Sequence, residues 1–248
     1  MSEIQQHLSK NYNGTCSIIE PVDGCVSFIR NEKYLKYLEG IKNICVLVPE
    51  SLIYETTNYF PKDNVYIYYV TNPEYEFTLY HNEYYKNFYP EPPTIGKNCE
   101  IHQTTILNVP GLKVVNGDNN ERLTFTHTGN TILGDNVEMG PYNVIHRGTL
   151  GSTIIRSGCK FGTHNNIGHN CDIGENTVIA SGAILNGGIK IGKNCWISSG
   201  AMIKHYVNIC DDVVIGMGSV VTKDITEPGI YVGSPAKFLK PKTEGWNF

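Results

Sequence analysis

A six-residue period runs through the second half of the sequence. The residue after each periodic one is usually small, as at Gly168 and Gly192, which suits a tight corner. Neither the 3.6-residue period of a helix nor the alternation of a two-faced strand fits this spacing. It is a hexapeptide repeat, which is typical of a parallel β-helix whose periodic side chains point inward. Every sixth residue is large and apolar at Phe161, Ile167, Ile173, Ile179, Leu185, Ile191, Ile197, Ile203, Ile209, Ile215 and Val221.

The period also predicts which residues meet on the surface. Three hexads form one triangular coil of 18 residues, and successive coils pair as parallel strands about 4.8 Å apart. Residues 18 apart in the sequence therefore lie in one column on the outside. A single coil cannot bury its apolar row, so the stability of such a domain comes from stacking.

The first part of the sequence lacks this period. Alternating strand-like and helical runs favour a small α/β domain there. Prolines at positions 90, 92 and 93 favour an extended linker. We therefore predict an α/β domain at residues 1–93, a parallel β-helix at residues 94–234 and a tail at residues 235–248. The strand-like runs are Cys25–Ile29, Ile44–Val48 and Val65–Val70, and the helical ones are Glu32–Glu39 and Glu74–Tyr85.

The repeat is interrupted twice. It begins at Ile95, is broken by the polar insertion Asn108–Asn130, and has ten residues instead of six between Ile145 and Ile155. Insertions that leave the coils intact become loops on the outer surface, where they often line a functional site. We expect the longer insertion to pack at an interface between subunits.

Composition narrows the classes of function. No apolar run is long enough to span a bilayer, and Met1–Asn13 is polar rather than signal-like. The net charge of −4, without a basic stripe, does not indicate a nucleic-acid partner. The eight cysteines include no CxxC pair, and several occupy small inward positions of the repeat. We interpret them as reduced, and expect a cytoplasmic protein without membrane insertion.

One column of the β-helix has residues suited to acyl transfer. His169, Gly187 and His205 are spaced 18 residues apart. A histidine can accept a proton from an amine near neutral pH, and a glycine leaves its N–H open to a developing oxyanion. A solvated corner histidine and a turn glycine explain the spacing equally well, so the column alone leaves both interpretations open.

The sequence resembles the left-handed β-helix acyltransferases. The resemblance is carried by Gly-x-Gly-Ser-Val-Val-Thr-Lys-Asp at residues 216–224 and by Val-Gly-Ser-Pro-Ala-Lys at residues 232–237. A closer resemblance, over almost the whole chain, is to the UDP-3-O-acylglucosamine N-acyltransferases of lipid A synthesis. It implies a left-handed β-helix and a homotrimer. It also implies that Ile167-Gly168-His169-Asn170 is the catalytic motif, with His169 as general base and Gly187 as the oxyanion glycine. We expect Asn170 to orient the base, and a purely structural role of this residue stays open.

The same resemblance suggests where the substrate binds. Residues 27–34 and Asn72-Pro73 resemble the uridine-binding segment, which makes residues 1–93 a nucleotide-binding domain. Phe28 and Tyr34 would bracket the uracil, and Asn31 would hydrogen-bond it. His146 stands where the family has Asp, and together with His164 it is expected to contact the substrate.

The departures from the family point to a short acyl donor. The chain stops at Phe248 without the helical extension of the lipid A enzymes, and its tail reads like that of acetyl-CoA-dependent members. His205 is one place out of step with the family's second histidine. We therefore expect transfer of acetyl from acetyl-CoA to the amine of a UDP- or dTDP-linked amino sugar, for a lipopolysaccharide or other glycan. No metal is expected, and the residues expected to bind acetyl-CoA are Gly187, His205, Lys223 and Lys237.

Three alternatives stay open. One is acylation of a UDP-glucosamine derivative from acyl carrier protein. Another is a metal hydratase resembling the γ-class carbonic anhydrases, in which His146, His164 and His169 would hold a metal between subunits. The third is a module that binds a nucleotide sugar without turnover. The sequence does not distinguish uridine from thymidine, N- from O-acylation or one amine position from another, and it does not identify the sugar or the pathway.

Overall fold

The computed structural model describes residues 3–56 and 64–242, which divide into two compact units. The amino-terminal unit is Met1–Tyr89 together with Leu112–Thr126, and the β-helix unit is Pro90–Gly111 together with His127–Phe248. The predicted boundary at residues 93 and 94 left the whole insertion Asn108–Asn130 in the β-helix. Most of that insertion instead groups with the amino-terminal unit.

The amino-terminal unit is built on a parallel sheet in the order β1-β2-β3. Strand β2 is central because Cys45 pairs with Val26 on one side and with Tyr66 on the other. Its apolar run is buried on both faces, as expected of a central parallel strand. The elements are α1 (Glu3–Asn11), β1 (Val26–Phe28), the 3₁₀ helix η1 (Glu32–Leu38), β2 (Cys45–Pro49), the 3₁₀ helix η2 (Glu50–Leu52), α2 (Ile53–Thr56), β3 (Tyr66–Val70), α3 (Pro73–Tyr84), β7 (Val114–Asn116) and β8 (Arg122–Thr124).

The predicted elements of this unit agree with the structure. All three predicted strands and both predicted helical stretches are present, with ends that differ by at most one residue, and the first helical stretch is a 3₁₀ helix. Helix α3 begins where the sequence provides a cap. The side-chain oxygen of Asn72 accepts a hydrogen bond from Tyr75 N at 3.2 Å, and Pro73 fills the first helical position.

Strands β7 and β8 form an antiparallel hairpin that packs within the amino-terminal unit. Lys113 Nζ lies 3.3 Å from a carboxylate oxygen of Glu74 and 4.5 Å from the ring centre of Phe125. Phe125 in turn stacks on Phe77 of α3. The expectation that the insertion lies between subunits stays a prediction, while the contacts of Lys113 and Phe125 are made within one chain.

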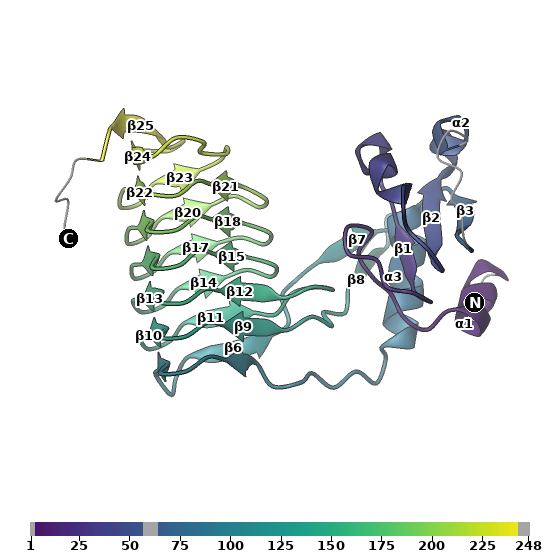
Figure 1. Cartoon of the computed structure of the whole chain (residues 1–248), viewed down its shortest axis with the longest axis horizontal. Coiled ribbons are helices and arrows are strands. Elements are labelled where there is room, and N and C mark those ends of the chain that lie inside the picture. Colours follow the sequence, from purple (N-terminus) through teal and green to yellow (C-terminus); the bar gives the residue numbers. More distant parts are fainter. Residues whose placement is uncertain (1–2, 57–63, 243–248) are drawn as a thin grey trace. The chain divides into compact units, whose positions relative to one another are not determined.

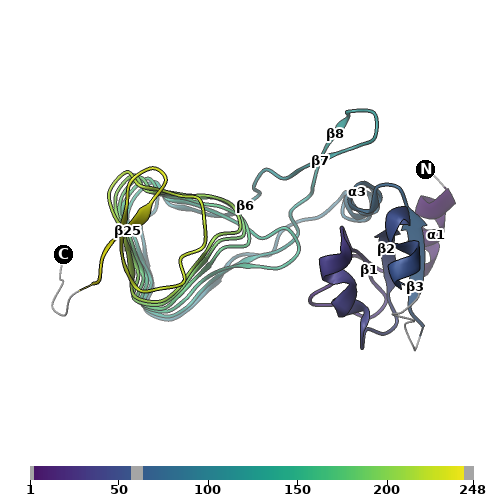
Figure 2. The ribbon, with the colours of Figure 1, turned by 90° about the horizontal axis from the view of Figure 1, so that it is seen from above.

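The β-helix unit consists of three sheets of stacked strands (Figures 1 and 2). Face one contains β5 (Glu100–Ile101), β10 (Glu138–Met139), β13 (Lys160–Phe161), β16 (Val178–Ile179), β19 (Trp196–Ile197), β22 (Val213–Ile215), β24 (Gly229–Val232) and β25 (Lys237–Lys240). Face two contains β6 (Ile106–Val109), β11 (Val144–His146), β14 (Asn166–Ile167), β17 (Ile184–Leu185), β20 (Met202–Ile203) and β23 (Val220–Val221). Face three contains β4 (Thr94–Ile95), β9 (Thr131–Leu133), β12 (Thr153–Ile155), β15 (Asp172–Ile173), β18 (Lys190–Ile191) and β21 (Asn208–Ile209).

The strand register confirms the 18-residue coil. Ile167 pairs with Leu185, and Leu185 pairs with Ile203, each one coil further along. The periodic side chains fill the axis of the unit, where Ile167, Ile179 and Ile197 are completely buried. Figure 2 looks almost along this axis, and the coils overlie one another. The predicted fold class, a left-handed hexapeptide β-helix preceded by a small α/β unit, is confirmed.

The end of the β-helix differs from the prediction. The chain was expected to leave the β-helix at Pro235, but β25 continues face one by pairing antiparallel with β24. Residues 243–248 of the predicted tail lie outside the described residues. In the part of the chain that the structure describes, no helix is long and apolar enough to cross a membrane.

Candidate active site

The candidate catalytic histidine lies at the corner between faces two and three of one coil. His169 follows β14 by two residues and is half-buried, and Asn170 turns the corner with φ at 59°. Asparagine tolerates this left-handed conformation better than most residues. Because β14 pairs with β17, the Gly187 corner lies next to the His169 corner, as the 18-residue spacing predicts.

The carboxamide of Asn170 is held in one orientation. Its Oδ1 accepts hydrogen bonds from the backbone N–H and the hydroxyl of Thr149, both at 2.9 Å. A backbone N–H can only donate, so the atom facing it must be the amide oxygen rather than the nitrogen. Thr149 belongs to the ten-residue break of the repeat, so that interruption holds Asn170 in place.

This orientation fixes the tautomer of His169. Nδ1 of His169 lies 2.9 Å from the same Oδ1 of Asn170. Since that oxygen can only accept, Nδ1 carries the hydrogen, and in the neutral ring Nε2 holds the lone pair. The geometry therefore presents Nε2 as the atom that can accept a proton.

Gly187 lies against the Nε2 side of the imidazole. A Cβ atom at residue 187 would lie 2.6 Å from both Cε1 and Nε2 of His169. Any side chain there would displace the ring, so this position requires glycine for its close approach. Among the backbone hydrogen bonds of residues 3–56 and 64–242, none has the Gly187 N–H as donor. Gly187 is buried, and its α-carbon lies close to the His169 ring.

A second histidine, which the repeat pattern does not single out, lies beside the first. His127 is 3% exposed, and its ring lies edge-on to that of His169, with 5.2 Å between the ring centres. It is the first residue of the β-helix unit after the segment Leu112–Thr126. No repeat spacing relates it to His169, so only its place at the end of the insertion could have drawn attention to it.

The two histidines expected to contact the substrate lie apart from each other. His146 ends β11 on face two, and its Nδ1 donates to the carbonyl oxygen of Pro110 at 3.1 Å. His164 is exposed at the preceding corner, between faces one and two, where it contacts Tyr142 and the hydroxyl of Thr163. Within one chain, His164 is therefore at a different corner from His169.

Two of the residues expected to bind acetyl-CoA continue the catalytic column. His205 is exposed one coil beyond Gly187. Lys223 is exposed one coil further, at a corner that is two residues shorter because Ile225 pairs with Ile209. Lys237 instead begins β25 on face one and does not belong to this column.

The residues expected to bind a nucleotide lie at the carboxyl end of β1. The side chain of Asn31 accepts from Lys33 N at 3.2 Å, which caps η1 and leaves the amide nitrogen to donate. It lines a pocket of about 270 Å³, whose described lining does not include Phe28 or Tyr34. Phe28 packs against Phe77, with ring centres 4.7 Å apart, while Tyr34 lies beside Tyr37. The bracketing of a base by Phe28 and Tyr34 therefore stays a prediction.

Asn72, part of the predicted uridine segment, is engaged inside the amino-terminal unit. In addition to capping α3, its amide nitrogen donates to Asn116 O and to a carboxylate oxygen of Asp118, both at 3.1 Å. Its hydrogen-bonding groups thus hold α3 to the hairpin.

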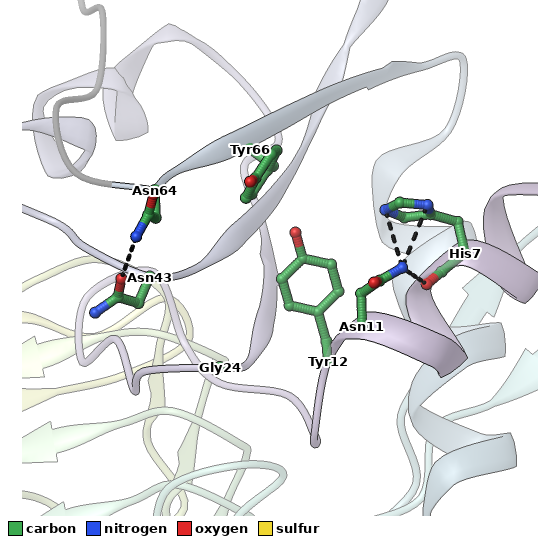
Figure 3. Close-up of a pocket in the computed structure, with 7 residues that line it drawn as sticks. All are labelled: His7, Asn11, Tyr12, Gly24, Asn43, Asn64 and Tyr66. Carbon is green, nitrogen blue, oxygen red and sulfur yellow. Dashed lines mark hydrogen bonds between the residues drawn. The ribbon is translucent and has the colours of Figure 1, made fainter.

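A larger pocket of about 450 Å³ lies at the other end of the same sheet (Figure 3). It is lined by His7, Asn11, Tyr12, Gly24, Asn43, Asn64 and Tyr66. None of the predicted site residues belongs to this described lining. The candidate nucleotide and catalytic residues are therefore elsewhere.

The alternative of a metal site gains no geometric support within one chain. In residues 3–56 and 64–242, no group of three His, Cys, Asp or Glu side chains is placed to hold a metal ion. The three histidines of that alternative are at different corners or engaged with neighbouring oxygens, as described above.

Comparison with known proteins finds acyltransferases among the relatives. The bacterial transferase hexapeptide model (six repeats) matches residues 188–223. The UDP-3-O-acylglucosamine N-acyltransferase of Shewanella denitrificans is 44% identical over 140 residues, which cover 55% of this chain and 40% of the relative. The enzyme of the same name from Coxiella burnetii is 42% identical over 138 residues, with the same coverage.

The chain thus spans about two fifths of the length of these curated relatives. The expected resemblance to these acyltransferases is confirmed over the matched part, which is 55% of this chain, and its extension over almost the whole chain stays a prediction. Among solved structures, the UDP-N-acetylglucosamine acyltransferase of Campylobacter jejuni is 20% identical with a TM-score of 0.49, covering 61% of this chain and 64% of that one.

Proposed function

Because the β-helix unit carries the hexapeptide repeat of bacterial transferases, we propose that this chain is an N-acyltransferase of nucleotide-linked amino sugars. The observation that carries the proposal is the set of contacts around His169. Asn170 fixes its Nδ1–H, so that Nε2 is left as a base, and Gly187 lies directly beside Nε2. Relatives whose names state acyl transfer to UDP-3-O-acylglucosamine support this choice of substrate class.

In the proposed reaction, the sugar amine attacks the carbonyl carbon of an acyl thioester. A C–N bond forms as Nε2 of His169 removes the proton from the amine. The electron pair of the carbonyl moves onto its oxygen, where the Gly187 N–H stabilises the negative charge. Collapse of this intermediate breaks the C–S bond, and the protonated His169 returns the proton to the departing sulfur.

The donor we propose is acetyl-CoA. His205 and Lys223 extend the column beyond Gly187, and three coils separate Lys223 from His169, or about 14 Å along the axis. A pantetheine arm lying along this column would place its phosphates near an exposed cation. Lys237 is on another face, so we leave it out of the proposed donor site of this chain.

The nucleotide of the acceptor is proposed to bind the amino-terminal unit near Asn31. Arg30 and Lys33 line the same pocket as Asn31, and both are cations that could meet a diphosphate. The free amide nitrogen of Asn31 can donate to a carbonyl of uracil or thymine. His146 is proposed to contact the sugar.

We also propose that the active assembly is a homotrimer in the cytoplasm. The outer face of a single β-helix is too flat to enclose two substrates, so a neighbouring subunit is needed to complete the site. His164 at the neighbouring corner would then contact the substrate bound by another copy.

The test is thiol release from acetyl-CoA with a panel of UDP- and dTDP-linked amino sugars. Turnover with one sugar supports the proposal and identifies the acceptor. The second candidate, favoured by the identity to UDP-3-O-acylglucosamine N-acyltransferases, is transfer of a longer acyl chain from acyl carrier protein. Turnover only with the carrier-protein donor would replace acetyl-CoA while keeping His169 and Gly187 in their roles.

A further inference from the structure

His127 is a buried imidazole that the proposed reaction does not use. Only 3% of it is exposed, and its ring meets the ring of His169 at 73° with centres 5.2 Å apart. Edge-on contacts of this kind between aromatic rings are favourable and restrict the orientation of both. The buried ring of His127 therefore restricts the orientation of the proposed base, His169.

Gly111 closes the third side of the same contact. A Cβ atom at residue 111 would lie 3.2 Å from Nε2 of His127 and 3.3 Å from Cδ2 of His169. Both separations are tighter than ordinary contacts, so a larger residue would push one imidazole away. The backbone at Gly111 bounds the side of the His169 ring that carries Cδ2, and the same position contacts the ring of His127.

The surroundings of His169 therefore leave its ring little freedom. Asn170 holds Nδ1 by a hydrogen bond, Gly187 borders Cε1 and Nε2, and Gly111 borders Cδ2. His127 is the one side chain among these contacts that packs against the ring through its own ring. Removing it would leave space beside His169 and allow other side-chain rotamers.

We propose that His127 is a positioning residue, which holds the imidazole of His169 in the orientation that directs Nε2 at the substrate amine. This inference rests on the proposed function of His169 as the base. His127 itself transfers no proton in this scheme. Small errors in the placement of a catalytic group lower the reaction rate strongly. An enzyme whose His169 ring can rotate should therefore have a lower kcat, even though the chemistry of the imidazole is unchanged.

The location of His127 also connects the insertion with the candidate active site. The segment Leu112–Thr126, which belongs to the amino-terminal unit, leaves the β-helix at Gly111 and returns to it at His127. Both of these residues contact the His169 ring or lie directly beside it. Where the chain re-enters the β-helix after the insertion, it therefore places the His127 side chain beside His169, which the regular repeat does not do.

The experiment compares His127→Ala with His127→Phe, with His102→Ala as the matched control. His102 is an exposed histidine whose Nδ1 bonds Thr104, in an early coil of the same unit. We expect His127→Ala to lower kcat roughly tenfold with KM nearly unchanged. His127→Phe, which keeps an aromatic edge but cannot transfer a proton, should recover most of this loss, and His102→Ala should match the wild type. Thermal melting checks that each variant is folded.

A second readout does not depend on turnover. Imidazole nitrogen resonances of ¹⁵N-histidine-labelled protein, assigned with His169→Ala, report the tautomer and mobility of His169. The proposal expects one Nδ1–H tautomer in the wild type and in His127→Phe, and a mixed or broadened signal in His127→Ala. If no sugar is turned over, the proposed function fails while this measurement still decides the role of His127.

Two results would overturn the proposal. One is an unchanged His169 signal in folded His127→Ala. The other is a loss of two or more orders of magnitude in kcat in both His127 variants while His169→Ala stays active, which would make His127 the base.

Discussion

Nδ1 of His169 lies 2.9 Å from Oδ1 of Asn170, its neighbour in the sequence. The same oxygen accepts from the N–H and the hydroxyl of Thr149, so it is held from two sides. A residue in an irregular loop thereby determines which nitrogen of the histidine is protonated. Activity should therefore depend on groups that never touch the substrate.

Asn170→Gly tests this dependence. Glycine adopts the positive φ of this corner without strain, so the variant removes the carboxamide and leaves the backbone intact. We expect kcat to fall about tenfold, because the hydrogen bond that selects the tautomer is lost. Asn170→Asp keeps an acceptor for Nδ1–H and for Thr149 and should retain more activity than Asn170→Gly. Equal activity of the glycine variant and the wild type would exclude an orienting role for Asn170.

Gly187→Ala should lower kcat strongly, although it adds only one methyl group. The added methyl group would lie 2.6 Å from Cε1 and Nε2 of His169, so the ring must move away from its position. We expect a loss of kcat of about 100-fold or more, with little change in melting temperature. The measurement is steady-state turnover beside a thermal melt. Wild-type turnover in the alanine variant would mean that neither the ring position nor this close approach matters.

Glu74 is expected to stabilise the amino-terminal unit through two cations. Its carboxylate, 23% exposed, pairs with Arg30 and with Lys113, and burial lowers the pKa of Lys113. Glu74→Gln leaves both cations without a counter-charge and should lower the free energy of unfolding by about 2 kcal/mol. Glu83→Gln is the control, because Glu83 forms an exposed ion pair with Lys86. This substitution should lower the free energy of unfolding by less than about 0.5 kcal/mol. Urea unfolding of both variants provides the comparison. Equal losses of unfolding free energy would contradict a stabilising role of Glu74 through its two cations.

The buried thiols should make the protein sensitive to alkali. Burial raises the pKa of Cys171 from its ordinary value of 9.0 to about 12, and that of Cys45 likewise to about 12. The unfolded chain therefore loses these protons first, so the free energy of unfolding should fall as the pH rises from about 9 towards 12. The repeat offers a matched variant, Cys171→Ala, since Ala183 and Ala201 fill the equivalent inward position of other coils. Urea unfolding between pH 8 and 10.5 should show a shallower decline for this variant than for the wild type.

The regular part of the molecule was predictable because one spacing determines it. Large apolar residues six apart had to fill an axis, and this placed Gly187 beside His169 one coil away, as the strand register confirms. The roles of Thr149 and His127 could not be predicted in the same way. Both belong to interruptions of the repeat, whose path depends on local turns and on contacts distant in the sequence rather than on a period.

The same distinction applies to the end of the β-helix and to the insertion. Lys237 was placed with the donor site from a tail motif, but the chain turns back at this point to form β25 on face one. The repeat also gives no indication that Phe125 and Lys113 of the insertion make aromatic and ionic contacts within the amino-terminal unit, while the place of the insertion at a subunit interface stays a prediction. A motif match identifies residue types, whereas the direction of the chain after the last full coil depends on pairing that no repeat specifies.

The most direct test of the central claim is the rate of thiol release from acetyl-CoA by wild type and His169→Ala, with the amino sugar that the wild type accepts. The account predicts a loss of kcat of about 10²- to 10⁴-fold in the variant, because a positioned general base contributes that much, with an unchanged melting temperature. Wild-type turnover in folded His169→Ala would contradict it, and the proton acceptor would then have to be sought elsewhere in the site.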